Sequence, residues 1–97
     1  MREIVLSPVA KEKLDSLLDY FEENFSQKVK SDFIELIEDI LQRIDKYPES
    51  FPASLKMKSV RRCLLNKNTV MFYRVKKSKI EILTFFDNRQ DPEKSTY

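Results

Sequence analysis

The stretch KMKSVRRCLLNKNTVMFYRVKKSKIEILTFFD, residues 56–87, decides the fold that this sequence predicts. It contains three runs rich in Val, Ile, Phe and Tyr, at residues 57–65, 69–75 and 79–86. These residue types favour β-strands, and the short polar breaks between the runs favour turns. We therefore expect a three-stranded antiparallel meander.

Charge is divided unevenly between the two halves of the chain, although the net charge is only +2. Residues 1–50 carry seven Lys or Arg against twelve Asp or Glu, and residues 51–97 carry eleven against four. Between residues 56 and 79 there are nine basic side chains and no acidic one. This pattern predicts a basic wall on the sheet that binds an anionic partner. The alternative is that the basic side chains only protect sheet edges from aggregation.

The first half of the chain predicts a strand followed by two helices. Residues 2–6 alternate as in a strand, and Ser7 then supplies a helix N-cap before Pro8. Ser26 can cap a second helix after a joint of one or two residues, which predicts an antiparallel helical hairpin. Pro48 and Pro52 interrupt the helical pattern, so residues 47–52 form a connector with Phe51 packed beneath it. The apolar positions of the two helices repeat at helical spacing, and all are assigned to the core: Leu14, Leu17, Leu18, Phe21, Phe25, Phe33, Ile34, Ile37, Ile40, Leu41 and Ile44.

Composition excludes several function classes. The 97 residues suit one domain, 1–97, and the single Cys63 has no partner for an internal disulfide. Without histidine a zinc site is implausible, and without glycine the phosphate-binding loops of nucleotide enzymes cannot form. We expect no cofactor and no metal. No apolar run is long enough for a membrane span or a signal peptide, so we expect a cytoplasmic protein that does not bind membranes.

Several short motifs, taken in order, resemble one protein family. These are SP-A near the start, YP and FP before the sheet, VRR-L, FYRV and the closing DNRQDP. From about Ile4 to Lys94 the chain is similar to the RelE/ParE superfamily of bacterial type II toxins, which includes plasmid stabilisation proteins. The resemblance implies an α+β fold with an N-terminal strand, a helical hairpin and a three-stranded antiparallel meander, the helices covering one sheet face. It also implies a growth-inhibiting toxin that is neutralised in a hetero-oligomer with a cognate antitoxin.

Members of this superfamily differ in their targets. One branch cleaves mRNA on the ribosome, another poisons DNA gyrase, and some members have no known target. In the nuclease branch, basic residues on the exposed sheet face hold RNA and a tyrosine near the C-terminus often assists. By this resemblance the catalytic candidates are Arg61, Arg89 and Tyr97, in a metal-independent endoribonuclease.

Three positions depart from the nuclease pattern. Thr69 and Val70 stand where the nucleases usually have an arginine. Cys63 lies near the position where the nucleases have a lysine, and Ser95 lies closest to the position of their C-terminal tyrosine. These departures favour a non-nucleolytic toxin of the gyrase-binding type. RNA cleavage remains the alternative, as does an inactive binding module of the same fold.

The target-binding candidates are the basic residues of the meander and the turn after it: Lys56, Lys58, Arg61, Arg62, Arg74 and Arg89. Strand alternation places Arg61 and Arg62 on opposite faces, and which of the two meets the target stays open. The structural alternatives are an ion pair of Arg89 with Asp87 or Asp91, and one of Arg74 with an N-terminal carboxylate. Cys63, Phe72 and Tyr73 are assigned to the core. We expect the antitoxin to be acidic, partly disordered, and folded on binding.

Overall fold

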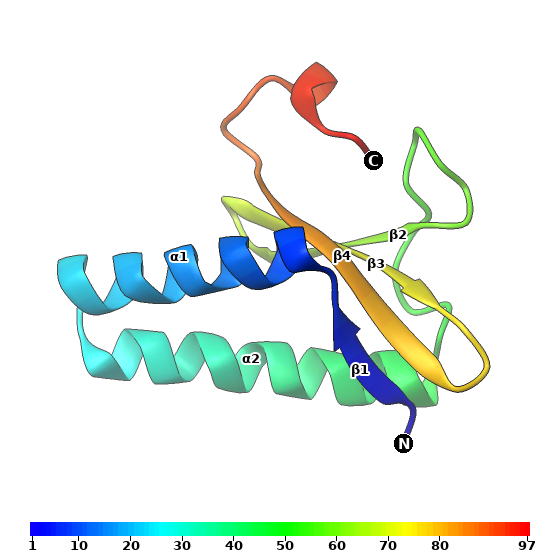
Figure 1. Ribbon diagram of the computed structural model, residues 1–97, viewed down its shortest axis with the longest axis horizontal. Helices are drawn as coiled ribbons and strands as arrows, with labels where there is room; N and C mark the ends of the chain where they lie inside the picture. Colours follow the sequence, from blue (N-terminus) through cyan, green and yellow to red (C-terminus); the bar gives the residue numbers. More distant parts are fainter.

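The computed structural model describes residues 1–97, with the exception of the side chain of Pro92 (Figure 1). Two helices lie side by side across one face of a four-stranded sheet. The elements are β1 (Glu3–Leu6), α1 (Pro8–Asn24), α2 (Gln27–Lys46), β2 (Arg61–Asn66), β3 (Thr69–Val75), β4 (Lys79–Asp87) and a 3-10 turn, η1 (Pro92–Lys94). Among the described residues, no helix has the length and apolar character needed to cross a membrane. The predicted α+β class and element order are confirmed.

The sheet has the strand order β1-β4-β3-β2. Neighbours β2, β3 and β4 pair antiparallel as predicted, whereas β1 runs parallel to β4, with Ile4 opposite Ile80. The first meander strand begins at Arg61, four residues later than the sequence predicted. Residues 57–60 instead form a turn, in which the amide of Val60 donates to the carbonyl oxygen of Met57 at 3.0 Å. The Val60 amide therefore finds its hydrogen-bond acceptor within the turn, whereas in a strand it would bond to a neighbouring strand.

A β-bulge in β4 decides which of its side chains face the helices. Phe72 of β3 lies opposite Thr84 and Tyr73 lies opposite Ile82, which leaves Leu83 as the extra residue. The Ser7 hydroxyl donates to the carbonyl oxygen of Leu83 at 2.7 Å and accepts from the amide of Ala10 at 2.9 Å. One side chain therefore caps α1 and ties its start to the bulge.

The helical hairpin forms as the sequence predicts. Pro8 opens α1, and the Ser26 hydroxyl caps α2 by accepting from the amide of Val29 at 3.1 Å. Only Phe25 and Ser26 separate the helices. The assignment of Phe25 to the core is wrong, because its side chain is 62% exposed. The closed end of the hairpin extends beyond the sheet in Figure 1, so nothing in the sheet can cover this ring.

Two apolar clusters occupy the two faces of the sheet. The helix-side core joins Phe33, Ile37, Leu41 and Ile44 of α2 to buried strand residues that include Tyr73. Phe51 packs edge-on against the Tyr73 ring with centroids 6.4 Å apart, as the connector pattern predicted. The smaller cluster lies on the opposite face, which we call the far face. Its members are Val60, Val70 and Phe72, with Leu83, Phe86 and Tyr97 packed against them.

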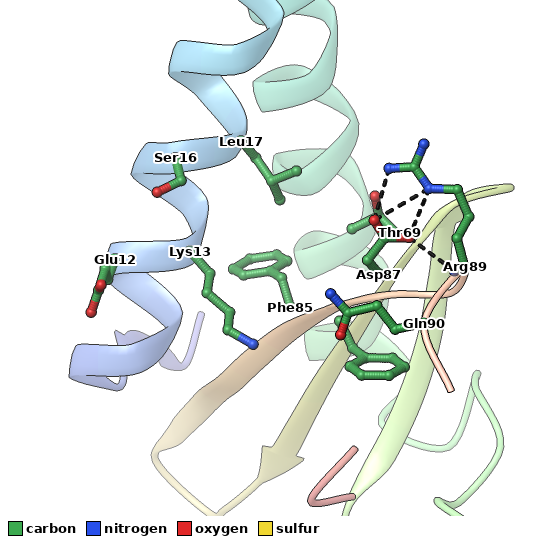
Figure 2. A pocket seen from close by; sticks show the side chains of 10 residues that line it. Glu12, Lys13, Ser16, Leu17, Thr69, Phe85, Asp87, Arg89 and Gln90 are labelled. Carbon is green, nitrogen blue, oxygen red and sulfur yellow. Dashed lines mark hydrogen bonds and ion pairs between the residues drawn. The ribbon is translucent and has the colours of Figure 1, made fainter. Parts of the chain in front are cut away.

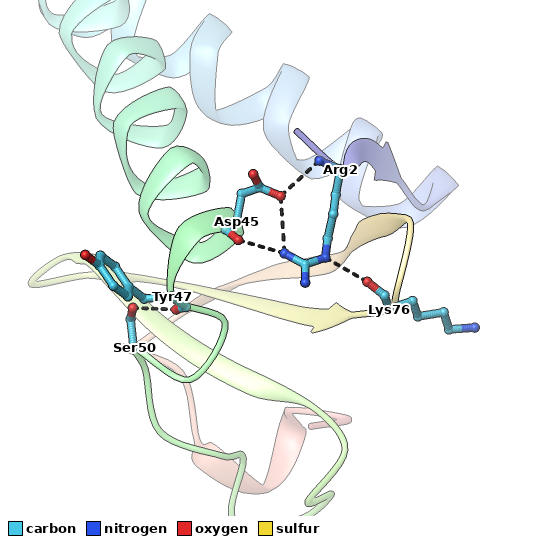
Figure 3. A network of polar contacts seen from close by, with 5 residues as sticks. All are labelled: Arg2, Asp45, Tyr47, Ser50 and Lys76. Carbon is cyan, nitrogen blue, oxygen red and sulfur yellow. Dashed lines mark hydrogen bonds and ion pairs between the residues drawn. The ribbon is translucent and has the colours of Figure 1, made fainter.

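Arg2 joins three parts of the chain at one corner of the fold (Figure 3). Its guanidinium donates to the main-chain oxygen of Asp45 at 2.7 Å and to that of Lys76 at 2.9 Å. Its amide donates to the Asp45 carboxylate at 2.9 Å, and this bond is the largest cause of a lowered Asp45 pKa. The network fastens the start of the chain to the end of α2 and to the β3–β4 turn.

Candidate functional site

The far face carries alternate side chains of β2, β3 and β4 that point away from the helices. Arg62 of β2 lies beside Phe72 of β3, and Arg74 lies beside Glu81 of β4. Phe72 is only 6% exposed, although α1 and α2 lie on the other face of the sheet. The ring of Tyr97 covers it, with centroids 5.7 Å apart and planes tilted by 39°. Residues around Tyr97 therefore form a lid on the sheet face opposite the helices.

Residues 93–97, which we call the tail, are held to the loop before β2. The Lys56 ammonium donates to the main-chain oxygen of Glu93 at 3.4 Å and to that of Ser95. The Ser54 hydroxyl donates to the main-chain oxygen of Tyr97. Lys56, predicted to bind the target, thus binds the protein's own tail.

Two hollows flank the tail, one on the far face and one between the tail and the start of α1. One of about 240 Å³ is lined by Lys56, Arg62 and Phe72 together with Tyr97, and the other, of about 270 Å³, by Lys13 and Lys94. Phe86, Ser95 and Tyr97 line both, so the hollows lie on either side of the same short segment. Among the described residues that line these two hollows, none is Asp or Glu. The basic side chains of these linings therefore favour a positive potential in both hollows.

Arg62 is the basic strand residue that this face leaves available. Its side chain is half-buried and lines the first hollow. Within the part of the chain that the structure describes, its guanidinium has no hydrogen-bond or ion-pair partner. A guanidinium in this position can bind a carboxylate or a phosphate through charge-assisted hydrogen bonds.

Arg61 lies on the other side of the sheet, as strand alternation predicted. It sits opposite Tyr73, whose ring is in the helix-side core. Its guanidinium donates to the main-chain oxygen of Phe51 at 2.8 Å and lies 3.9 Å from the Glu49 carboxylate. Arg61 therefore holds the connector, and of the two arginines it is Arg62 that faces the site.

Arg74 does lie on the far face but pairs with a carboxylate other than the one predicted. Its guanidinium is 3.1 Å from Glu81 of β4, not from an N-terminal acid. Lys76 and Lys79 lie 3.5 Å and 3.8 Å from the same carboxylate. The hydrogen bond from Arg74 and these positive charges lower the pKa of Glu81.

Arg89 lies beyond the end of β4, at the mouth of a third hollow of about 250 Å³ between α1 and the sheet. It pairs with Asp87 at 2.7 Å, one of the two predicted partners, and this lowers the pKa of Asp87 to about 2. In Figure 2 the guanidinium points away from the hollow, while Lys13 reaches from α1 toward Gln90. Lys58 is exposed on the loop before β2, away from these hollows.

The proposed catalytic set is therefore not assembled. Arg61 faces the helices, Arg89 follows β4, and Tyr97 lies on the far face over Phe72. Burial raises the pKa of Cys63 to about 11 and that of Tyr73 to about 12, so neither ionises readily near neutral pH. Among the described residues, no group of three acidic, cysteine or histidine side chains is placed to hold a metal ion.

Sequence reasoning missed Lys13 and Lys94 as members of the site. Lys13 comes from a helix whose exposed side is mainly acidic, and Lys94 from the short turn after the sheet. Both line the hollow beside the tail. No local pattern marks them, because only the packing of α1 and the tail against β4 brings them together.

The strand, helical hairpin and meander, with a basic sheet face opposite the helices, define the RelE/ParE class of small toxins. Residues 4–92 match the family described as "ParE toxin of type II toxin-antitoxin system, parDE". The chain belongs to this ParE toxin family. No curated protein gives a significant sequence match.

Solved structures from three bacteria have the same fold. A chromosomal ParDE system from P. aeruginosa matches with a TM-score of 0.69 at 17% identity, covering 90% of this chain and 96% of that one. The YoeB-YefM complex from Staphylococcus aureus matches with a TM-score of 0.62 at 20% identity, covering 89% and 95%. The DinJ-YafQ complex from E. coli matches with a TM-score of 0.61 at 10% identity, covering 90% and 93%.

Proposed function

We propose that this toxin inhibits growth by binding its target through the far face, without cleaving RNA. The observation that carries the proposal is a groove with no Asp or Glu among its described lining residues, in which Arg62 is available while the three catalytic candidates are dispersed. Binding needs only positive potential and apolar contact, both of which this groove offers. DNA gyrase is the target we propose, because the departures from the nuclease pattern point to that branch of the superfamily.

Cleavage of RNA would require more than charge. A proton-transfer group and a cation must both lie within hydrogen-bond reach of one phosphate. Arg61 is separated from Tyr97 by the thickness of the sheet, and Arg89 is engaged by Asp87. Because these three candidates do not converge on one phosphate, their positions support a mechanism of binding without cleavage.

One arrangement favours the second candidate, a ribosome-dependent endoribonuclease. Tyr97, Lys56 and Arg62 line a single hollow, so a hydroxyl and two cations are close together. A phosphate there could accept hydrogen bonds from both cations. In this alternative Arg62, rather than Arg61 or Arg89, would stabilise the reacting phosphate.

We further propose that an acidic antitoxin neutralises the toxin by covering the far face. Family membership supports a cognate antitoxin, and two of the matching structures are themselves complexes of paired proteins. Complementary charge accelerates association at low salt. We expect the association rate to fall steeply as salt rises; an equal rate at low and high salt would contradict electrostatic masking.

Induction of the toxin alone tests the proposed mechanism. We expect growth arrest with DNA breaks and intact mRNA. Arg62→Gln should relieve the arrest, whereas Lys67→Gln, the same charge change on the exposed β2–β3 turn, should not. Cleaved mRNA would instead support the nuclease, and unaffected growth would support the inactive binding module.

A further inference from the structure

We propose that two copies of this chain associate through their helical hairpins, with Phe25 of each copy seated in the hollow between α1 and the sheet of the other. This hollow is the one of about 250 Å³ at whose mouth Arg89 lies, and we call it the α1 hollow. The association uses the hairpin side of the molecule, so it depends neither on the proposed target nor on the far face.

The closed end of the hairpin exposes an aromatic cluster. Phe25, which joins the two helices, is 62% exposed, and Tyr20 near the end of α1 is 49% exposed. Their rings lie edge to face with centroids 5.9 Å apart, and the Phe21 ring lies 6.3 Å from that of Phe25. Because this end of the hairpin extends beyond the sheet in Figure 1, the cluster projects from the molecule. Exposed apolar patches of this kind mark association surfaces.

The α1 hollow offers an apolar floor within a rim of balanced charge. Leu17, Phe85 and Phe86 supply its apolar lining, and Figure 2 shows Leu17 of α1 directed toward the Phe85 ring of β4. Two basic and two acidic residues are among the described residues that line it: Lys13, Arg89, Glu12 and Asp87. An apolar floor within a polar rim favours an apolar group that is oriented by its polar surroundings. An exposed aromatic ring flanked by charged side chains fits this description.

Spacing along α1 allows both copies to make the contact at once. The α1 residues that line the hollow fall within 12–17, and Phe25 follows the middle of that segment by about ten positions, roughly 15 Å along a helix. When two α1 helices cross antiparallel about a two-fold axis close to Tyr20, Phe25 of each copy lies level with the 12–17 segment of the other. Such an interface uses the same surface on both copies and closes as a dimer.

Tyr20 lies on the same side of α1 as the hollow. It follows Ser16 by four positions and Leu17 by three, which is the spacing of neighbours on one helix face. The pKa of Arg89 is raised, chiefly by its hydrogen bond to Asp87 and with a smaller contribution from Tyr20, so Tyr20 is within electrostatic range of the mouth of the hollow. One continuous surface therefore runs from the hollow through Tyr20 to the aromatic cluster.

Charges beside the two features are complementary. Asp19 and Glu23 are exposed next to the aromatic cluster, and among the described residues neither carboxylate has an ion-pair partner. Lys13 and Arg89 line the hollow, and the guanidinium of Arg89 stays mostly exposed although it pairs with Asp87. In the two-fold pair the acidic tip of one copy approaches the cations of the other. This complementarity favours a second copy as the occupant and sets its orientation.

Sedimentation of the full-length protein over a range of concentrations tests the association. We expect a monomer–dimer equilibrium in which Phe25→Ser raises the dissociation constant of the dimer at least about tenfold, because buried aromatic side chains carry much of the binding energy of an interface. Leu64→Ser removes an apolar side chain of similar exposure, 56%, from β2 and should leave that constant unchanged. Circular dichroism verifies that each variant is folded.

A cross-link tests the two-fold arrangement. Tyr20→Cys places a thiol close to the axis in each copy, where the two Cα atoms can approach within the roughly 7 Å that a disulfide requires. Under mild oxidation we expect a disulfide-linked dimer, which adding Phe25→Ser should abolish. Tyr47→Cys, at an exposed position after α2, should not form this link, and neither should the buried Cys63 of the wild type.

Several results would overturn the proposal. If the wild type stays a monomer at about 1 mM, where even weak association populates a dimer, a second copy is not the occupant of the hollow. Equal dissociation constants in the wild type and in folded Phe25→Ser would place the interface elsewhere. Growth into polymers, or a Tyr20→Cys dimer that does not cross-link, would contradict the two-fold arrangement.

Discussion

The two faces of the sheet are covered in different ways. On the helix side, two helices of 17 and 20 residues bury a large apolar core. On the far face, three buried residues are covered by a five-residue tail and a loop. The first covering contributes most of the apolar burial and hence most of the stability, whereas the second buries a smaller apolar cluster. The two faces of the sheet therefore contribute unequally to stability.

Loss of packing on the helix side should have the largest effect. Ile44 of α2 is 0% exposed, so Ile44→Ala leaves a cavity and should lower the free energy of unfolding by about 2–5 kcal/mol. Leu64→Ala, on the far face at 56% exposure, should change it by less than about 0.5 kcal/mol. Urea denaturation measures both. Similar losses would mean that the two faces contribute equally.

Removal of the lid should have an intermediate effect. Tyr97→Ala deletes the ring contact with Phe72 and should lower the free energy of unfolding by about 0.5–1.5 kcal/mol. The helix-side core should be unaffected, which near-ultraviolet circular dichroism and the denaturant slope can verify. A loss as large as that of Ile44→Ala would show that the tail is an integral part of the core.

Two hydroxyl groups, one in the helix-side core and one bound to the tail, should contribute differently to stability. Among the buried side chains described, the Tyr73 hydroxyl has no hydrogen-bond partner, so Tyr73→Phe should change the free energy of unfolding by less than about 0.5 kcal/mol or increase it. Ser54→Ala removes a hydroxyl that does bind the tail and should cost about 0.5–1.5 kcal/mol. A clear loss in Tyr73→Phe alone would contradict this assignment.

The smallest expected effect on stability comes from the ion pair between Asp87 and Arg89. Their ion pair lowers the pKa of Asp87 from its ordinary 3.8 to about 2, so the stabilisation is present above the ordinary pKa and is lost as the pH falls toward 2. In Arg89→Gln the Asp87 pKa should return toward 3.8, as carboxyl NMR titration can measure. Arg62→Gln, on the far face, should leave the Asp87 pKa unchanged. A changed Asp87 pKa in this variant would mean that Arg62 also contributes to the electrostatic potential at Asp87.

Local patterns predicted most of the fold. Ser7 and Ser26 cap the helices, and alternation correctly separated Arg61 from Arg62, because capping and pleating depend on neighbouring residues. The exposure of Phe25 was missed, since helical spacing does not reveal how far the hairpin extends past the sheet. The late start of β2 was missed because the apolar residues before it also suit a turn.

The site was less predictable than the fold. Alternation left open which of Arg61 and Arg62 faces away from the helices, and the partners of Arg61 and Arg74 depend on contacts across strands and with the connector. Tyr97 was singled out as a catalytic candidate, yet its place over Phe72 follows from tertiary packing of the tail. A charge pattern indicates that cations are present, and only the fold determines which are already neutralised.

The parallel pairing of β1 with β4 has a consequence for biosynthesis. β1 is translated well before its partner strand Lys79–Asp87, with both helices between them in the sequence. A nascent chain on the ribosome therefore cannot close its sheet until β4 has left the exit tunnel, and long-range pairing of this kind forms late in folding. The helical hairpin, whose contacts are local, can form while β1 still lacks its neighbour in the sheet.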